Sequence, residues 1–218
     1  QATLDELPRK KGQKHRYLPI DFSKTNQIKS KIERHLSKYP DAHILINNTG
    51  GPAGGAVIDA SPEQFVQTFN EHVVSAQILT QAVVGSMKSA GFGRIINITS
   101  IGMKQPIVGL GVSNTIRAAM GNWAKSMANE LGKFGITTNI VLPGYTTTGR
   151  LQKVNEMKAA STSKSIAEVE QDLIKDIPIG RFTTPQETAA VIAFLCSPAA
   201  ASVNGVSIPV DGGKTSSL

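Results

Sequence analysis

Short, continuous runs of apolar and β-branched residues alternate with amphipathic segments along this chain, and this alternation constrains the fold more than any other feature. Because the runs are not themselves alternately polar and apolar, both faces of each strand are expected to be covered. Strands that alternate with helices form a parallel sheet with helices on both faces. We therefore predict a doubly wound α/β fold with strands at 16–20, 43–47, 94–98, 137–142 and 206–210.

Three of the predicted helices begin with a capping box. Ser61-Pro62-Glu63-Gln64 and Thr184-Pro185-Gln186-Glu187 each place a hydroxyl before a Pro and a side-chain acceptor at the third helical position. The same pattern without the Pro occurs at Ser165-Ile166-Ala167-Glu168. We predict that the first of these helices runs to residue 87, and apolar spacing predicts two more at 28–36 and 116–131.

Length and composition indicate one globular domain over residues 1–218. No apolar run is long enough for a membrane span, which needs about 18 residues, so we expect no membrane insertion. A single Cys, Cys196, excludes an internal disulfide and weakly favours a cytoplasmic location.

The net charge is +7, and many of the cations lie between residues 9 and 16. Such a run can bind nucleic acid or form a solvated surface, and it can also favour a phosphorylated cofactor or an acidic acyl carrier. We expect no nucleic-acid partner, because no aromatic residues are interleaved with these cations.

Three short motifs follow predicted strands. The first motif places small residues at a strand end, where a ribose can approach the backbone; it is Asn47-Asn48-Thr49-Gly50-Gly51. Taken by itself, this motif also predicts an ordinary turn. Pro143-Gly144 with Thr148 follows another strand. Ser100 comes directly after the apolar run that contains the strand at 94–98. Ser113 and Arg117 follow on a predicted helix, where residues four apart lie on the same face.

The order and spacing of these motifs resemble the short-chain dehydrogenase/reductase family. The resemblance implies a Rossmann-type fold, NAD or NADP as the cofactor, and a carbonyl/alcohol substrate pair. In the family a Ser that contacts the substrate is followed by a Tyr and then a Lys. Ser100 matches the Ser, whereas Ser113 and Arg117 stand at the Tyr and Lys positions.

The exchanged residues change the expected chemistry. A phenol has a pKa near 10 that a nearby cation can tune, whereas an aliphatic hydroxyl such as that of Ser113 is a far weaker acid. Arg117 keeps its proton but can donate hydrogen bonds to ribose hydroxyls. His72 aligns with the family's fourth catalytic position, an Asn, and it can also be a packed core residue. Proton transfer then falls to water, Ser113, His72 or Tyr145.

Several further assignments follow from the resemblance. Asp21 stands where the family contacts the adenine ring, although a carboxylate that favours a helix N-terminus is an equal alternative. Residues 149–184 are a candidate substrate lid or a surface excursion. No metal site is expected. The residues expected to hold the cofactor are Asp21, Asn48, Gly50, Arg117, Pro143, Gly144 and Thr148.

The Gly-rich strand–turn–helix unit that opens a Rossmann-type domain does not precede residue 16. Residues 1–7 look like the tail of a helix, and we expect about 35–45 residues, one strand–helix–strand unit, to be absent before them. The strand at 16–20 would then lack a neighbour, and the strand at 43–47 would expose an apolar edge.

Two functions remain open. The first is an NAD(P)(H)-dependent oxidoreductase that acts on a carbonyl/alcohol pair, with a 3-oxoacyl thioester as a candidate substrate. The second is a catalytically silent nucleotide-binding protein that acts as a sensor or a partner subunit. Resemblance alone predicts a homotetramer or homodimer, assembled through the helices at 61–87 and 114–131 and the last strand.

Overall fold

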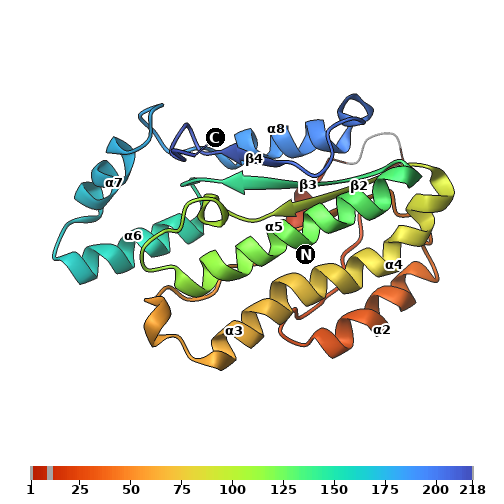
Figure 1. Cartoon of the computed structure of the whole chain (residues 1–218), viewed down its shortest axis with the longest axis horizontal. Coiled ribbons are helices and arrows are strands. Elements are labelled where there is room, and N and C mark those ends of the chain that lie inside the picture. Colours follow the sequence, from red (N-terminus) through yellow and green to blue (C-terminus); the bar gives the residue numbers. More distant parts are fainter. Residues whose placement is uncertain (1, 9–11, 218) are drawn as a thin grey trace.

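The computed structural model describes residues 2–8 and 12–217, and a parallel sheet forms its centre (Figure 1). The strands β1 (Ile44–Asn47), β2 (Gly93–Ile98), β3 (Ile136–Pro143) and β4 (Ser207–Val210) lie in the order β1-β2-β3-β4. Every neighbouring pair is parallel. The predicted α/β architecture is therefore confirmed, with strands at four of the five predicted positions.

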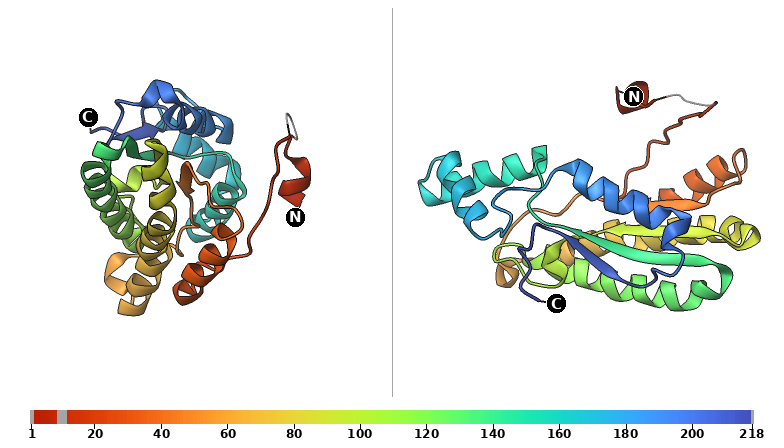
Figure 2. Two further views of the ribbon diagram at one scale, coloured as in Figure 1. Left: turned by 90° about the vertical axis from the view of Figure 1, so that its right-hand side faces the viewer. Right: turned by 90° about the horizontal axis from the view of Figure 1, so that it is seen from above.

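Helices cover both faces of the sheet, as Figures 1 and 2 show. The helices α4 (Ser75–Ala90) and α5 (Gly111–Leu131) lie on one face, and α8 (Pro185–Cys196) lies on the other. Successive side chains of β2 point to opposite faces, so Ile95 packs with the α4 and α5 residues and Ile96 with those of α8. Both isoleucines are fully buried.

The long helix predicted from Ser61 to residue 87 is confirmed with one interruption. It consists of α3 (Pro62–Phe69), a π-helical turn (Asn70–Val74) and α4. The capping box is complete, because the Ser61 hydroxyl accepts from the Gln64 backbone and the Gln64 carboxamide accepts from the Ser61 backbone. The π turn was not predicted, because the spacing of apolar residues along a helix does not show where one additional residue is inserted in a turn.

The remaining helices surround this core. Helix α2 (Thr25–Leu36) packs beside α4, and α6 (Gly149–Thr162) and α7 (Ile166–Lys175) project beyond the carboxyl end of the sheet (Figure 1). The capping boxes predicted for α7 and α8 are both present. The predicted helical tail near the start is α1 (Ala2–Glu6), and short 3₁₀ helices lie at 57–59, 101–103, 132–134 and 198–200.

The strand predicted at 16–20 is wrong. These residues form no ladder with a neighbouring strand, Tyr17 is 61% exposed, and the Pro19 carbonyl accepts from the Lys31 side chain. A β-strand needs a partner, and within the described part of the chain β1 pairs only with β2. The expected apolar edge is present, because Ile44 and Ile46 are both about half exposed.

Part of the predicted basic run lies outside the described residues, namely Arg9, Lys10 and Lys11. Lys14 and Arg16 are exposed. Over residues 2–8 and 12–217, no helix has the length and apolarity that crossing a bilayer requires.

Candidate functional site

The parallel strands place four connections at one edge of the sheet. Residues 48–51 follow β1, Thr99 and Ser100 follow β2, residues 144–148 follow β3, and Asp211 follows β4. In open α/β sheets the crevice at the carboxyl ends of the strands is the usual position for ligands. The three predicted motifs therefore meet at this edge, where α5 brings Ser113 and Arg117.

Buried Asn side chains near the strand ends connect the strands to each other and to the loops that follow. Asn47 and Asn97 are paired in the β1–β2 register, and Nδ2 of Asn47 donates to Oδ1 of Asn97 over 2.9 Å. Asn139 of β3 donates to the Val203 carbonyl over 2.7 Å and is also fully buried. These amides fix the relative positions of the strands and of the loops that follow them.

Arg117 and Ser113 lie side by side on α5, as the spacing predicts. Nε of Arg117 donates to the Ser113 hydroxyl over 3.1 Å, and Nη1 donates to the Thr99 carbonyl over 2.7 Å. The guanidinium is therefore held next to the peptide that precedes Ser100. Burial lowers the pKa of Arg117 to about 10, and the positive charge of Arg150 acts in the same direction. Arg117 still carries its charge at neutral pH.

Ser100 lies half-buried at the end of β2 in an extended conformation. Its Oγ accepts from the Gly102 backbone over 3.1 Å, which caps the short helix at 101–103. A Cβ at Gly102 would lie only 2.6 Å from Oδ1 of Asn114, so this turn needs Gly to pack against α5. The turn fixes the Ser100 hydroxyl and leaves its O–H free to donate.

His72 lies in the π turn and is only 5% exposed. Its Nδ1 lies 2.7 Å from the Thr49 hydroxyl, which connects the helix to the loop after β1. Burial lowers the pKa of His72 to about 4, the charge of Arg117 acts in the same direction, and the Gly50 backbone opposes both. The imidazole is therefore neutral at physiological pH. Its buried Nε2 has no hydrogen-bond partner among the described residues.

The loop after β3 has a close approach that only Gly permits. A Cβ at Gly144 would lie 2.7 Å from Cβ of Asp211 and 2.8 Å from its Cα. Thr148 caps α6, because its hydroxyl accepts from the Leu151 backbone over 3.4 Å. Pro143 ends β3. The motif therefore turns the chain sharply from the sheet into α6.

Other predicted cofactor residues make few contacts or only local ones. Asn48 and Gly50 are exposed, and a Cβ at Gly50 would meet nothing within 4 Å, so there is open space beside this loop. Asp21 is exposed and accepts from the backbone and hydroxyl of Ser23, which lower the pKa of the carboxyl. It also lies at the N-terminus of α2, because its carboxylate is 3.7 Å from Nζ of the N-cap residue Lys24 and its carbonyl accepts from the Lys24 backbone.

Tyr145 packs into an apolar cluster. Its ring lies edge-on to Phe182, with centroids 6.2 Å apart, beside residues of α6 and α7. Burial raises the pKa of its phenol, Lys214 acts in the opposite direction, and Asp176 raises it further. Within residues 2–8 and 12–217, the charged side chains that act on this phenol are Lys214 and Asp176.

The predicted lid, residues 149–184, contains α6, α7 and a connecting turn. Val169 and Leu173 of α7 pack against Ala159 of α6, so the two helices hold each other. The buried Asn155 donates to Glu170 over 3.1 Å.

Arg150, which the sequence did not predict, lies near Arg117. It lies in the first turn of α6, and its Nη2 donates to the Pro52 carbonyl over 2.8 Å. The bond crosses from the β3 side of the crevice to the loop that follows β1. No local pattern marks this residue, because its partner is distant in the sequence.

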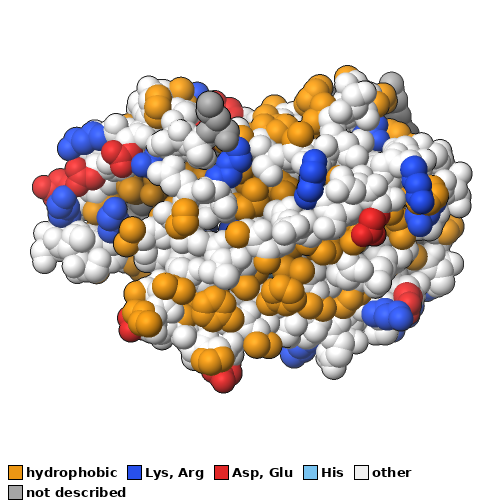
Figure 3. Space-filling model, viewed as in Figure 1, with side chains coloured by type: hydrophobic (Ala, Val, Ile, Leu, Met, Phe, Trp, Pro, Cys, Tyr) orange, Lys and Arg blue, Asp and Glu red, His pale blue; other side chains and the backbone are white. Residues whose placement is uncertain are grey.

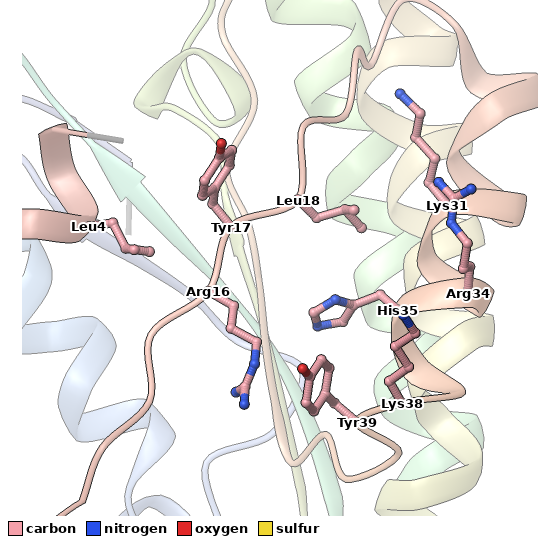
Figure 4. Close-up of a pocket in the computed structure, with 9 residues that line it drawn as sticks. All are labelled: Leu4, Arg16, Tyr17, Leu18, Lys31, Arg34, His35, Lys38 and Tyr39. Carbon is pink, nitrogen blue, oxygen red and sulfur yellow. The ribbon is translucent and has the colours of Figure 1, made fainter.

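A cavity of about 490 Å³ lies elsewhere, between α2 and the extended segment at 16–18 (Figure 4). The Arg16 guanidinium lies over the Tyr39 ring, 3.8 Å from its centroid, and His35 contacts the same ring. Its lining includes none of the predicted site residues. No cluster of metal-ligating side chains occurs among the residues that the structure describes.

Comparison with known proteins agrees with this geometry. Residues 1–215 match the family described as enoyl-(acyl carrier protein) reductase. The chain is 30% identical to a putative ketoacyl reductase of Streptomyces coelicolor over 214 residues, which are 97% of this chain and 82% of that protein. It is 26% identical to the 3-oxoacyl-[acyl-carrier-protein] reductase FabG of Chlamydia trachomatis over 219 residues, 98% of this chain and 82% of that protein.

A solved structure has the same fold throughout. The L-sorbose reductase of Gluconobacter frateurii, in complex with NADPH and L-sorbose, superposes with a TM-score of 0.91 at 28% identity. The match covers 100% of this chain and 83% of that one.

Proposed function

The chain belongs to the short-chain dehydrogenase/reductase family, and from this premise we propose that it is an NAD(P)(H)-dependent oxidoreductase acting on a carbonyl/alcohol pair. One observation carries the proposal. The Arg117 guanidinium is fixed between the Ser113 hydroxyl and the Thr99 carbonyl, so a cation and a hydroxyl group lie where β2 ends, next to Ser100 in the sequence. The carboxyl end of a parallel sheet is where α/β proteins usually bind dinucleotides.

The residues present fit a nicotinamide cofactor. The space beside Gly50 admits a ligand against the backbone, and Asn48 is exposed to it. Arg117 would donate to the ribose hydroxyls, and Thr148, Pro143 and Gly144 would border the nicotinamide end. When bound, the cofactor supplies or accepts the hydride. NADPH is the cofactor in the complex of the L-sorbose reductase, which supports NADP as a candidate beside NAD.

Ser100 would orient the substrate carbonyl. Its Oγ accepts from Gly102, which leaves the O–H free to donate to a carbonyl oxygen. The positive charge of Arg117, one hydrogen bond from Ser113, would stabilise negative charge on that oxygen as hydride arrives. Ser113 would then pass a proton between this oxygen and solvent rather than act as an acid itself.

The neutral His72 does not supply a proton as an imidazolium, because its pKa is about 4. The contact with Thr49 supports a positioning role, in which His72 holds the loop after β1 in place. Among the proton routes considered, water through Ser113 is therefore favoured over His72 and Tyr145. The names of the relatives support an acyl thioester with a 3-oxo group as a candidate substrate.

The experiment is a titration of the full-length protein with NADH and with NADPH, followed by a panel of ketones, 3-oxoacyl thioesters and sugars. Binding of either nucleotide with turnover of a carbonyl supports the oxidoreductase. Binding without turnover supports a silent sensor or partner subunit, which the exchange of Tyr and Lys for Ser113 and Arg117 favours. Absence of binding to both nucleotides overturns both functions.

We also propose that the protein assembles as a homotetramer or homodimer. Hydrophobic side chains gather over α3 and the neighbouring helices on the face shown in Figure 3, and Val66 and Phe69 are 61% and 40% exposed. An exposed apolar face of this kind favours association with a second copy. Sedimentation equilibrium tests it, and a monomer at micromolar concentration contradicts it.

A further inference from the structure

We propose that Arg117 and Arg150 form a binding site for an anionic group, a carboxylate or a phosphate, above Gly51. The inference deepens the proposed function. It rests on that function only for which ligand, substrate or cofactor, carries the anionic group. It adds an acidic group to the substrate or cofactor as a requirement for recognition. The two arginines come from α5 and α6, on opposite sides of the crevice.

The guanidinium groups converge on one point. A Cβ placed on Gly51 would lie 3.3 Å from Nη2 of Arg117 and 3.7 Å from Nη2 of Arg150. The two nitrogens are therefore at most about 7 Å apart. A carboxylate or phosphate with charge-assisted hydrogen bonds of about 2.8 Å on either side can bridge two nitrogens up to about this distance apart.

Neither arginine has an acidic partner among the described residues. Arg117 uses Nε and Nη1 on Ser113 and Thr99, and Arg150 uses Nη2 on the Pro52 carbonyl. Two like charges at this separation repel each other, and Arg117 is largely removed from water. An anion bound between them would be attracted to both guanidinium groups and would offset the repulsion between them. A neutral ligand would not offset it.

The surroundings favour the same ligand. His72, whose pKa the charge of Arg117 helps to lower, is neutral at physiological pH and adds no charge of either sign. Gly51 has no side chain, so no Cβ lies between the two guanidiniums; a Cβ there would lie 3.3 Å from Nη2 of Arg117, closer than an ordinary contact. Arginine suits both groups, because its planar fork donates two parallel hydrogen bonds.

Calorimetric titration of the full-length protein with malonate and with inorganic phosphate, at constant ionic strength, tests the site. We expect Arg150→Gln to weaken binding about 10- to 100-fold, the usual effect of one charge-assisted hydrogen bond. Lys153→Gln is the matched control, since it removes one charge from an exposed position on the same helix. It should leave the affinity unchanged.

Gly51→Ala is a second variant, which removes no charge. Its methyl group would lie between the two guanidiniums and weaken binding of both probes by steric exclusion. A melting curve for each variant identifies loss of folding. Equal affinity in the wild type and in all three variants overturns the site, as does absence of binding of both probes to the folded wild type.

The source of the anion is decided by repeating the titration with saturating NADPH. Competition identifies a cofactor phosphate as the natural ligand, whereas binding in the presence of NADPH identifies an acidic group of the substrate. Both results support the site. Failure of the proposed function is a separate result, because Arg150-dependent malonate binding without nucleotide binding retains the anion site and rejects the oxidoreductase.

Discussion

Nε of Arg117 donates to the hydroxyl of Ser113, one helical turn earlier on α5, over 3.1 Å. The pair thus forms a connected unit, with the serine oxygen directed by the cation. Because Nη1 also reaches the Thr99 carbonyl, the unit is anchored to the strand that carries Ser100.

Replacing Arg117 by Met should weaken the binding of NADPH about 10- to 100-fold, since a charged donor at the ribose is lost. The change in nicotinamide fluorescence on titration measures this affinity. Lys125→Met serves as the control, because Lys125 lies on the same helix but donates to the Gly205 carbonyl. Equal affinities of the two variants would contradict a role for Arg117 in the crevice.

Ser100→Ala should lower kcat about 10²- to 10³-fold, the usual effect of removing one hydrogen bond to a developing oxyanion. The affinity for nucleotide should change little. Ser126→Ala, whose hydroxyl donates to a carbonyl within α5, should leave kcat unchanged. Steady-state and single-turnover kinetics on the preferred carbonyl provide the measurement, and an unaltered kcat in Ser100→Ala would reject the assignment.

His72 makes stability depend on pH. Its pKa is about 4 in the folded protein and about 6.5 in the unfolded chain, so the unfolded chain binds more protons between these values. The contribution of His72 is therefore present above pH 6.5 and is lost as the pH falls towards 4. Between pH 8 and pH 5 the free energy of unfolding should fall by up to about 2 kcal/mol from this residue.

Urea denaturation of the wild type and of His72→Asn at both pH values measures this difference. The Asn variant lacks the titrating ring, so its stability should fall less on acidification. An identical fall in the two proteins would show that other groups control the pH dependence.

Arg94 is expected to matter for stability and not for function. It is only 2% exposed, and its guanidinium donates to the carbonyls of Gly93, Gly135 and Ser197. Arg94→Met removes these three hydrogen bonds, one of them to the buried Gly93, and should cost about 1–3 kcal/mol. Denaturation in urea should show this loss, while the exposed Lys133→Met should stay within about 0.5 kcal/mol of the wild type.

Tyr145→Phe should leave kcat unchanged, because the ring of Tyr145 packs with Phe182 and with residues of α6 and α7. Tyr145→Ala should instead lower the melting temperature by opening a cavity between α6 and α7. A marked fall in kcat for Tyr145→Phe, with unchanged stability, would restore this phenol as the proton donor.

The sequence predicted the parts of the fold that depend on local signals. Capping boxes located the starts of α3, α7 and α8, and continuous apolar runs located the four strands. The segment at 16–20 has the same apolar character as these strands. The prediction of a strand there was wrong because a strand forms only when a neighbouring strand pairs with its backbone. A local sequence pattern does not show whether such a neighbour is present.

The candidate site was predictable where helical spacing or strand ends place residues together, as with Ser113, Arg117 and Ser100. The contacts of His72 with Thr49 and of Arg150 with Pro52 were not predictable, because they join segments that are far apart in the chain. Thr49 was the one visible signal, since it places a hydroxyl within the motif at 47–51, and His72 contacts this hydroxyl.

The π turn at 70–74 has a consequence for how this chain tolerates change. A π turn contains about one residue more than an α turn, so deletion of a single residue there can restore an uninterrupted α-helix. Because the wider turn takes in its additional residue, α3 would keep roughly its present orientation relative to α4. Val66 and Phe69 would stay exposed, whereas the side chain of His72, which lies within the turn, would be displaced from the Thr49 hydroxyl. The additional residue thus serves the contact with the loop after β1 and leaves the outer face of α3 unchanged.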